Sequence, residues 1–403
     1  MTAPQGGGAL AGLRVIDLGK IYNGPYAGLL MAHLGADVIK VEPPGGENLR
    51  YRAAPGIETH EFVMLNSNKR AVVVDLKRPE GREVLKDLVR NADVLIENFA
   101  RGAMERMGLG YDVLSEINPR LVFGSGKGYG LSGPYADMPA MDITVQAMSG
   151  VIASTGFPDG PPVKAGPAFM DFMGGIHLFS GIMAALVQRS VTGRGQLVEV
   201  SMHDTVFPTL ASAIGGIYNR VLEDIPERTG NRHSGLAVSP YGVYPTSDGY
   251  VALFCVSEAH WKSLLSVMDR EDLLEDPRFA STHLRAGQLE EVDAQVSAWT
   301  VLHDKWWLVH ALEACGVPCA PVQTVREVVD DPHLKERGMI RQVQHPRIGE
   351  VPVVGNPLRL SDSPLTEVRV APALGEHTDE VLRELPGYTV ERVSELRAAG
   401  VVA

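Results

Sequence analysis

Leu13-Arg-Val-Ile-Asp17 is a short run of β-branched and apolar residues that predicts a β-strand. The run Asp37-Val-Ile-Lys-Val-Glu42 predicts a second strand. Between them, residues 25–34 have apolar side chains at helical spacing, and Gly35 ends this predicted helix. Continuous apolar strands separated by a helix are typical of a parallel sheet that is covered on both faces. Residues 13–42 therefore predict an α/β fold.

The same alternation continues to residue 201. Further strands are predicted at 71–75, 93–97, 121–124 and 197–201, and further helices at 80–91 and 170–189. This pattern predicts a doubly wound, Rossmann-like core.

The residue composition changes near residue 222, where residues typical of turns become frequent. A predicted strand at 250–255 is followed by helical stretches at 261–268 and 289–314. One hydrophobic core seldom serves more than about 250–300 residues, and the chain has 403. We therefore predict a large Rossmann-like domain over residues 1–221, a smaller α+β domain over 222–325, and a return to the large domain over 326–403.

Composition excludes several classes of protein. Hydrophobic residues make up 45% and charged residues 21%, as in ordinary globular proteins. The formal net charge is -12 without a basic block, so we expect no nucleic-acid partner. We expect no membrane partner either, because no unbroken apolar run reaches the roughly 18–20 residues that a span requires. Residues 1–8 lack the basic-then-apolar pattern of a signal peptide.

The chain has only three cysteines, namely Cys255, Cys315 and Cys319. This low, odd number predicts a reducing cytoplasm and no disulfide framework. No adjacent His or Cys pair completes a zinc site around Cys315-Gly-Val-Pro-Cys319, so we expect no metal.

Asp171 is predicted to lie at the start of the helix 170–189 and has two interpretations. As a helix cap, its carboxylate would accept hydrogen bonds from free backbone N–H groups. As a nucleophile, it would be kept ionised by the helix N-terminus and would attack an acyl group. The two roles are compatible. Gly174-Gly175, one turn later, are expected to leave room for a bulky ligand.

Two further features have both a functional and a structural interpretation. Gly124-Ser-Gly-Lys-Gly-Tyr-Gly130 lacks the spacing of phosphate-binding loops, which leaves a flexible loop beside a ligand or a plain turn. Basic residues near predicted strand ends are either solvated charges or ligand contacts, and they are Lys40, Lys69, Arg70, Lys77 and Arg106. Asn98-Phe99 follows a strand directly and is expected to line the ligand crevice of the sheet.

Short segments along nearly the whole chain carry a family resemblance by their order and spacing. They are Gly24-Pro25 with 34–42, Asn66-Ser-Asn-Lys-Arg70, 93–99, 102–108, Ile117-Asn-Pro-Arg-Leu121, Thr192-Gly-Arg-Gly-Gln196 and Leu374-Gly-Glu-His-Thr378. In this order they resemble the class III CoA-transferases, the family of formyl-CoA transferase and carnitine CoA-transferase.

The resemblance implies a fold, substrates and site residues. The family fold is an interlocked, ring-like homodimer in which each chain has a Rossmann-like large domain and a small domain. The substrates are an acyl-CoA and a carboxylic acid. Asp171 falls at the position of the family's catalytic aspartate. The residues that fall at coenzyme A-contacting positions are Tyr22, Asn23, Val74, Lys77, Asn98, Phe99 and Arg106.

The family mechanism fits these residues. Asp171 attacks the donor thioester and forms a mixed anhydride, and the released CoA thiolate then attacks the anhydride to give an aspartyl-CoA thioester. The acceptor carboxylate reverses these steps. Such intermediates require a site that excludes water and donors for the developing oxyanion, which we expect from the backbone of 126–130.

Racemases that act on 2-methylacyl-CoA are the main alternative, because they also keep an Asp before Gly-Gly. They place a catalytic His before an Asp-Ile dipeptide, whereas this chain reads Pro139-Ala-Met-Asp-Ile143. Met141 cannot exchange a proton, and racemisation needs two acid/base groups, which disfavours this alternative. A silent CoA-binding protein and a dinucleotide-dependent oxidoreductase are further alternatives. Asp17-Leu-Gly-Lys20 lacks the glycine fingerprint of the oxidoreductase.

The sequence leaves the two acids unnamed. Oxalate-using members of the family carry consecutive glycines in the small domain, where this chain has Thr229-Gly-Asn-Arg-His-Ser-Gly235. Arg232 and His233 either bind a second carboxylate or are exposed turn residues. Apolar residues near Asp171 either line an acyl pocket or pack in the core, and they are Met141, Phe169, Met170 and Met173.

Overall fold

The computed structural model describes residues 7–54, 56–219 and 226–403. Contacts between described residues divide the chain into two compact units. Unit 1 comprises Met1–Val145, Pro167–Val206 and Asp331–Ala403, and unit 2 comprises Gln146–Gly166 and Phe207–Asp330. The predicted domain boundary between residues 221 and 222 lies outside the described residues, and the three-part division stays a prediction.

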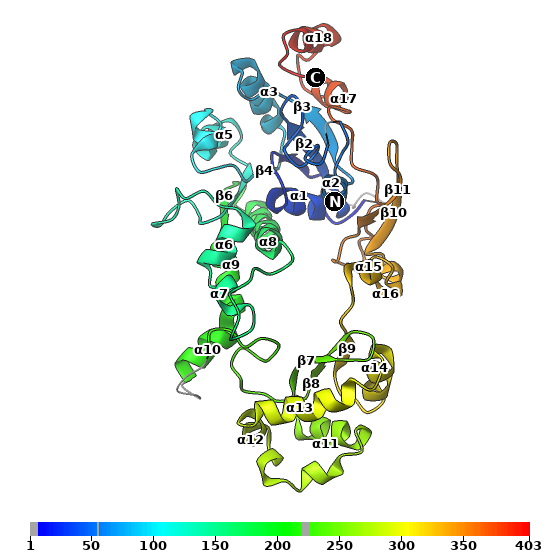
Figure 1. The fold of residues 1–403 in the computed structure, drawn as a ribbon. Coiled ribbons are helices and arrows are strands. Elements are labelled where there is room, and N and C mark those ends of the chain that lie inside the picture. Colours follow the sequence, from blue (N-terminus) through cyan, green and yellow to red (C-terminus); the bar gives the residue numbers. More distant parts are fainter. Residues whose placement is uncertain (1–6, 55, 220–225) are drawn as a thin grey trace. The chain divides into compact units, whose positions relative to one another are not determined.

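Unit 1 is built on a six-stranded parallel sheet with the order β3-β2-β1-β4-β5-β6 (Figure 1). The strands are β1 (Arg14–Asp17), β2 (Asp37–Glu42), β3 (Arg70–Val73), β4 (Val94–Glu97), β5 (Val122–Lys127) and β6 (Leu197–Ser201). Each lies within three residues of its predicted ends. The predicted parallel α/β fold is therefore confirmed, and its strand order reverses between β1 and β4.

Successive strand residues alternate between two hydrophobic cores, one on each face of the sheet. Val15, Val38 and Val94 pack on the face covered by α1 (Asn23–His33) and α8 (Phe169–Thr192). Ile16, Ile39 and Leu95 pack on the opposite face. The helices of that face are α3 (Pro79–Arg90), α5 (Tyr111–Ile117), α17 (Thr378–Arg383) and α18 (Val390–Ala398). Each fully buried side chain of this size stabilises the fold by about 1.5–3 kcal/mol.

The glycine-rich run begins as the end of β5 and not as a flexible loop. A Cβ on Gly124 would lie 2.8 Å from Ile182 Cδ1, and a Cβ on Gly126 would lie 2.2 Å from Asn23 Oδ1. The helices on this face thus approach β5 too closely for any side chain at these two positions. Only residues 128–130 extend beyond the strand.

Helix α8 is the longest described helix, and it is long and apolar enough to cross a membrane by length and composition, with a mean hydropathy of 1.5 over 18 residues. Core helices have the same properties. In unit 1, Leu178 and Ile182 on α8 are fully buried against the sheet, whereas Val187 and Val191 near its end are exposed.

Unit 2 contains an antiparallel sheet of the order β7-β8-β9, formed by Tyr241–Pro245, Tyr250–Phe254 and Cys319–Pro321. Its core surrounds Trp261 on α11 (Glu258–Val267). The predicted helical stretch 289–314 is two helices, α13 (Leu289–Thr300) and α14 (Lys305–Glu313). The break occurs because Asp304 caps α14, with Oδ1 accepting hydrogen bonds from the backbone of residues 306 and 307.

The remaining described elements are short. They are α2 (His60–Asn66), α4 (Ala103–Arg106), α6 (Asp142–Met148), α7 (Val151–Ser154), α9 (Met202–Val206), α10 (Ala211–Asn219), α12 (Thr282–Ala286), α15 (Val325–Val328), α16 (Pro332–Glu336), β10 (Ile340–His345) and β11 (Gly349–Val354). Single 3-10 turns occur at Phe207–Leu210, Glu271–Leu274 and Pro277–Phe279.

Candidate active site

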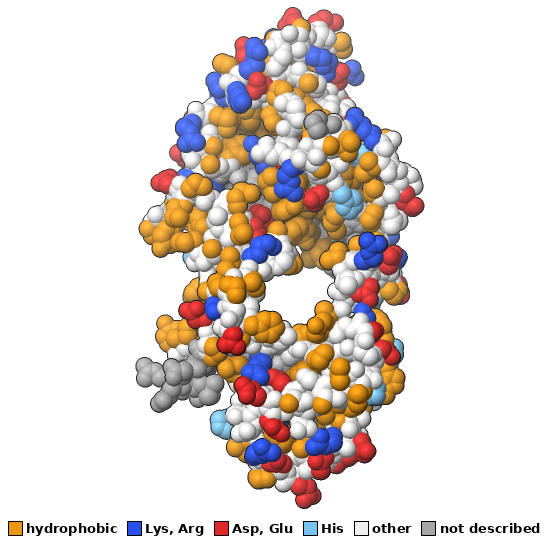
Figure 2. Space-filling model, viewed as in Figure 1, with side chains coloured by type: hydrophobic (Ala, Val, Ile, Leu, Met, Phe, Trp, Pro, Cys, Tyr) orange, Lys and Arg blue, Asp and Glu red, His pale blue; other side chains and the backbone are white. Residues whose placement is uncertain are grey.

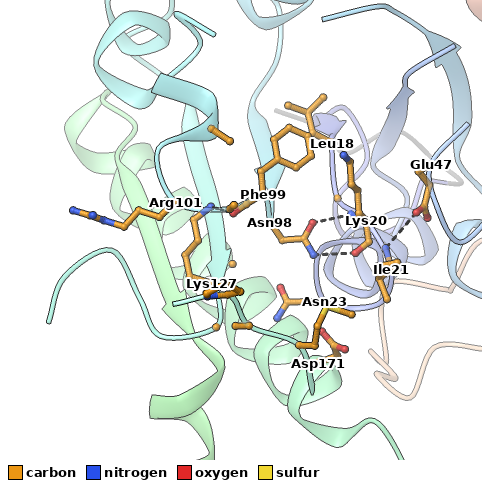
Figure 3. Close-up of a pocket in the computed structure, with 18 of the residues that line it drawn as sticks. Leu18, Lys20, Ile21, Asn23, Glu47, Asn98, Phe99, Arg101, Lys127 and Asp171 are labelled. Atoms are coloured by element: carbon orange, nitrogen blue, oxygen red, sulfur yellow. Dashed lines mark hydrogen bonds between the residues drawn. The ribbon is translucent and has the colours of Figure 1, made fainter. Parts of the chain in front are cut away.

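A cavity of about 690 Å³ opens at the carboxyl edge of the sheet in unit 1, where the strand order reverses (Figure 3). Its walls are the ends of the six strands and the segments that follow them, together with residues 136–141 and Asp171 on α8. Doubly wound sheets bind ligands at this point, and cofactor-sized ligands occupy pockets of roughly 300–1,000 Å³. The cavity is thus the candidate ligand site of unit 1.

Most of the predicted contact residues line this cavity, namely Asn23, Val74, Lys77, Asn98 and Phe99. In the described part of the chain, Tyr22 and Arg106 are not among the lining residues. The Tyr22 ring stacks on Phe172, with ring centroids 5.8 Å apart. Arg106 is exposed, and its guanidinium donates to the backbone oxygen of Arg101. Arg101, which no sequence pattern indicated, lines the cavity.

Asn98 joins the two loops that diverge at the reversal of strand order. Its Nδ2 donates to Lys20 O at 2.9 Å, and its Oδ1 accepts from Lys20 N at 2.7 Å. The Lys20 ammonium lies 4.4 Å from the centre of the Phe99 ring, in cation–π geometry. Burial lowers the pKa of Lys20. The Asn98 amide and the Lys20 ammonium therefore connect the two wall segments that follow β1 and β4.

Lys127 of the glycine-rich run is paired inside unit 1. Its Nζ donates to both carboxylate oxygens of Glu97, at 2.7 and 2.8 Å, and to Phe99 O at 2.7 Å. Ser125 Oγ donates to the same carboxylate at 2.5 Å. Lys127 thus fixes the end of β4 against β5, although it also lines the cavity.

The other basic residues near strand ends have separate roles. Lys40 is buried and donates to Gly19 O at 2.7 Å, and Lys69 is buried and donates to Asp17 Oδ2 at 2.7 Å. Arg70 begins β3 at the opposite edge of the sheet and pairs with the carboxylates of Asp37 and Glu384. Of the five predicted cations, only Lys77 is among the cavity-lining residues of the described chain.

Asp171 is the third residue of α8 and does not cap it. The N-cap residue is Ala168, which has no side-chain cap. Asp142, the first residue of α6, instead accepts hydrogen bonds through Oδ2 from the backbone N of Met170 at 2.9 Å and of Asp171 at 3.4 Å. The predicted cap role of Asp171 is therefore wrong, because Asp171 lies inside the helix and Asp142 accepts hydrogen bonds from its first N–H groups.

The surroundings of Asp171 disfavour the ionised carboxylate that the sequence predicts. Burial and the neighbouring charge of Asp142 raise the pKa of Asp171 to about 7. Two backbone N–H groups at the start of α8 donate to Asp142 and not to the Asp171 carboxylate. A titratable group tuned to this range, in a cavity, is typical of a reactive site.

Replacement of Asp142 by asparagine is expected to shift the activity profile to lower pH. The amide oxygen can still accept the two backbone hydrogen bonds. Burial still raises the pKa of Asp171, but the added effect of the Asp142 charge is gone. If the reaction requires the ionised carboxylate of Asp171, the acid limb of kcat/KM should lie near pH 7 in the wild type and lower in Asp142→Asn. A pH–rate profile with an unmoved acid limb would contradict this coupling.

The methionines near Asp171 separate into two groups. Met141 is 58% exposed and lines the cavity, as do Met138 and Met202. Met170 is fully buried in the core. Within the described structure, Met170, Met173 and Phe169 are not among the cavity-lining residues.

Gly174 and Gly175 make room for helix α1 and not for a ligand. A Cβ on Gly174 would lie 2.1 Å from Asn23 Nδ2, and a Cβ on Gly175 would lie 2.7 Å from Asn23 O. Asn23, the first residue of α1, is thereby held against the first turns of α8.

Other predicted binding residues lie outside this cavity. Among the described residues, no group of three or more His, Cys, Asp or Glu side chains is arranged to hold a metal ion. In unit 2, Arg232 pairs with Asp293 at 2.7 Å, and the His233 ring accepts a hydrogen bond from Gly235 N.

Similarity to known proteins extends over nearly the whole chain. The family model "CoA-transferase family III" matches residues 10–378. Formyl-CoA:oxalate CoA-transferases from Streptomyces avermitilis and Streptomyces coelicolor are each 38% identical to this chain, covering 98% of it and 99% of their own length. Among solved structures, a CAIB/BAIF family protein from Brucella suis is similar with a TM-score of 0.82 at 34% identity, covering 94% of this chain and 99% of its own. Rv3272 from Mycobacterium tuberculosis is similar with a TM-score of 0.81 at 30% identity, covering 93% and 99%.

Proposed function

Because this chain belongs to CoA-transferase family III, we propose that it moves CoA from an acyl-CoA donor to a carboxylic acid acceptor, with Asp171 as the covalent carrier. One observation carries the assignment of the carrier. Asp171 is a carboxylate with a pKa raised to about 7, and it lies in the wall of a ligand-sized cavity at the reversal point of the sheet. A basic carboxylate is a better nucleophile than an ordinary one, and it needs no large change of pH to ionise.

The proposed reaction has two symmetrical halves. An Asp171 oxygen attacks the thioester carbonyl of the donor, and the CoA thiolate leaves to give a mixed anhydride. The thiolate then attacks Asp171 Cγ, and the donor acid leaves as a carboxylate. The acceptor carboxylate attacks the resulting aspartyl-CoA thioester, and the same two steps run in reverse. One thioester is exchanged for another, so the free energy of the thioester bond is conserved.

The cavity offers contacts for the different parts of CoA. We propose that Asn23, Val74, Lys77, Asn98 and Phe99 contact it. Lys77 brings positive charge to the cavity wall, which suits the phosphate groups of CoA, and Arg101 lines the same wall while paired with Asp137 at 2.5 Å. The proposed contacts of Tyr22 and Arg106 rest on the family resemblance alone.

A racemase would need a second acid/base group at position 141. Met141 is exposed and lines the cavity, but its thioether cannot carry a proton. The acids themselves are left to experiment. Relatives named formyl-CoA:oxalate CoA-transferase favour formyl-CoA and oxalate, whereas residues 229–235 lack the consecutive glycines of oxalate-using members. Measuring CoA transfer with a panel of acyl-CoA donors and carboxylate acceptors, including formyl-CoA and oxalate, shows whether the protein uses these two substrates or others.

The covalent intermediate tests the proposed function. The protein is incubated with an acyl-CoA without acceptor, treated with borohydride, and digested for mass spectrometry. Reduction of an aspartyl thioester should convert Asp171 to homoserine. Asp112→Asn, which changes an exposed aspartate in the first turn of α5, should leave this labelling intact. Label at other residues only, or solvent deuterium entering the α-carbon of a 2-methylacyl-CoA, would reject the transferase assignment.

We also propose an interlocked homodimer in the cytoplasm. Apolar side chains are exposed on both units, among them Val187 and Val191 in unit 1 and Phe207 and Ile217 in unit 2. Figure 2 shows one face of the molecule, and hydrophobic side chains are distributed over its surface. Exposed apolar side chains that form a contiguous patch are typical of protein interfaces. Light scattering measures the mass in solution, and a monomer of 43.5 kDa would contradict the dimer.

A further inference from the structure

Asn23 has a buried side-chain amide without a hydrogen-bond partner. Its exposure is 2%, and within the described residues neither Nδ2 nor Oδ1 has a partner. Other buried asparagines of unit 1 do have partners, namely Asn66, Asn68, Asn118 and Asn356. An unpaired buried amide lowers stability, so its presence calls for a functional reason.

Two glycines, Gly126 and Gly174, leave the space that the Asn23 amide fills. Its Oδ1 lies 2.2 Å from the place of a Cβ on Gly126, and its Nδ2 lies 2.1 Å from the place of a Cβ on Gly174. Any other residue at either position would collide with the amide. The amide is thus confined between β5 and α8 while it lines the cavity.

The confined amide lies on the face of α8 that carries Asp171. Residues three apart on a helix share a face, with Cβ atoms about 5–6 Å apart, and Gly174 is three residues after Asp171. The contact between Nδ2 and the Gly174 position therefore places the donor one turn from the carboxylate. Figure 3 shows both side chains at the same end of the cavity. No hydrogen bond to the Asp171 carboxylate is present among the described residues.

We propose that Asn23 Nδ2 donates a hydrogen bond to the carbonyl oxygen of acylated Asp171 and stabilises the oxyanion that forms there. This inference rests on the proposed function. It assigns to the side chain a role in the chemistry beyond contact with CoA.

The proposed hydrogen bond acts when Cγ of Asp171 is attacked. The CoA sulfur adds to Cγ of the anhydride, and the carbonyl π electrons move to the oxygen. Collapse restores the C=O bond and breaks the bond to the donor acid. The same oxyanion forms when the acceptor carboxylate adds to the aspartyl thioester and the CoA thiolate leaves. A donor that is already confined requires no reorganisation at that moment, which is the condition for strong oxyanion stabilisation.

Asn23→Leu tests this role, because leucine keeps the branched shape and removes the donor. Rapid quenching with acyl-CoA, followed by intact-mass spectrometry, measures how fast the aspartyl-CoA form appears. The expected rate is about 10²–10³-fold lower than in the wild type, with acyl-CoA affinity changed only about twofold. The Tm should not fall, because the amide it replaces has no partner within the described chain.

Asn118→Leu is the matched control. The Asn118 amide is also buried, but it donates to Val89 O and Ala92 O, and it is not among the cavity-lining residues of the described chain. Its replacement should lower Tm and leave the rate of aspartyl-CoA formation in folded protein unchanged.

Each outcome is decisive. A wild-type rate in Asn23→Leu, or a loss explained by weaker acyl-CoA binding alone, overturns the inference. If Asn23→Leu does not fold, the smaller Asn23→Ala is measured in the same way, and failure of both to fold shows a structural role and also overturns it. Absence of aspartyl-CoA in the wild type rejects the proposed function itself, which keeps the two failures distinguishable.

Discussion

Asp171→Asn is expected to lower kcat for CoA transfer by at least about 10⁴-fold, because the amide keeps the shape of the carboxylate but cannot attack a thioester. Binding of acyl-CoA should persist, since the cavity is otherwise unchanged. Coupled assay of the product acyl-CoA measures the rate, and Asp112→Asn again serves as the exposed control. A kcat within about tenfold of the wild type would remove Asp171 from the mechanism.

The same variant should be more thermally stable than the wild type at pH 8. The pKa of Asp171 is raised to about 7, so between about pH 4 and 7 the folded protein holds a proton that the unfolded chain has released. Ionisation in the folded state therefore costs stability, fully above about pH 7 and less as the pH falls toward 4. The gain in Tm of Asp171→Asn should shrink over that range. An equal or lower Tm at pH 8 would show that the carboxylate is not destabilised by its surroundings.

Lys69→Met is expected to lower the free energy of unfolding by about 3–5 kcal/mol. The Lys69 ammonium is completely buried, and it donates to Asp17 Oδ2 at 2.7 Å, to Pro25 O at 2.9 Å and to Asn66 Oδ1 at 3.0 Å. Methionine fills a similar volume but leaves the buried Asp17 carboxylate without this partner. Loss of the contact with Pro25 should also loosen the segment that carries Asn23.

Urea-induced unfolding, followed by circular dichroism, measures this effect. Lys86→Met is the control, because Lys86 pairs with the 65% exposed Glu83 on α3 and such pairs contribute less than about 1 kcal/mol. Similar losses for Lys69→Met and Lys86→Met would show that the buried pair adds no more than a surface pair.

The parallel sheet was predictable because its strands are continuous apolar runs, which only burial on both faces explains. Residues 13–17 and 37–42 alone indicate this arrangement. Contacts between residues that are distant along the chain were not predictable in the same way. Asp142, 29 residues before Asp171, accepts hydrogen bonds from the first N–H groups of α8. No local pattern around Asp171 indicates this contact.

The candidate site was predictable where residues directly follow strands, as for Asn98 and Phe99. The sequence is less informative where tertiary packing decides the role of a residue. Gly126 and Gly174 suggest flexibility or space for a ligand, but each accommodates one buried amide. The unpaired state of the Asn23 amide depends on every neighbour in three dimensions, and no local pattern encodes it. The cap at Asp304, by contrast, is a local signal, because an aspartate directly before a helical stretch is typical of a helix start.

The discontinuity of the two units has a practical consequence for dissecting the protein. Unit 2 occupies Gln146–Gly166 and Phe207–Asp330, so α8 with Asp171 lies between its two segments along the chain. No single truncation yields either unit intact. A gene for unit 1 alone must join residue 145 to 167 and residue 206 to 331 through two designed linkers. A single proteolytic cut within residues 207–330 breaks unit 2 alone, but each of the two fragments then carries parts of both units, so the cut does not separate them.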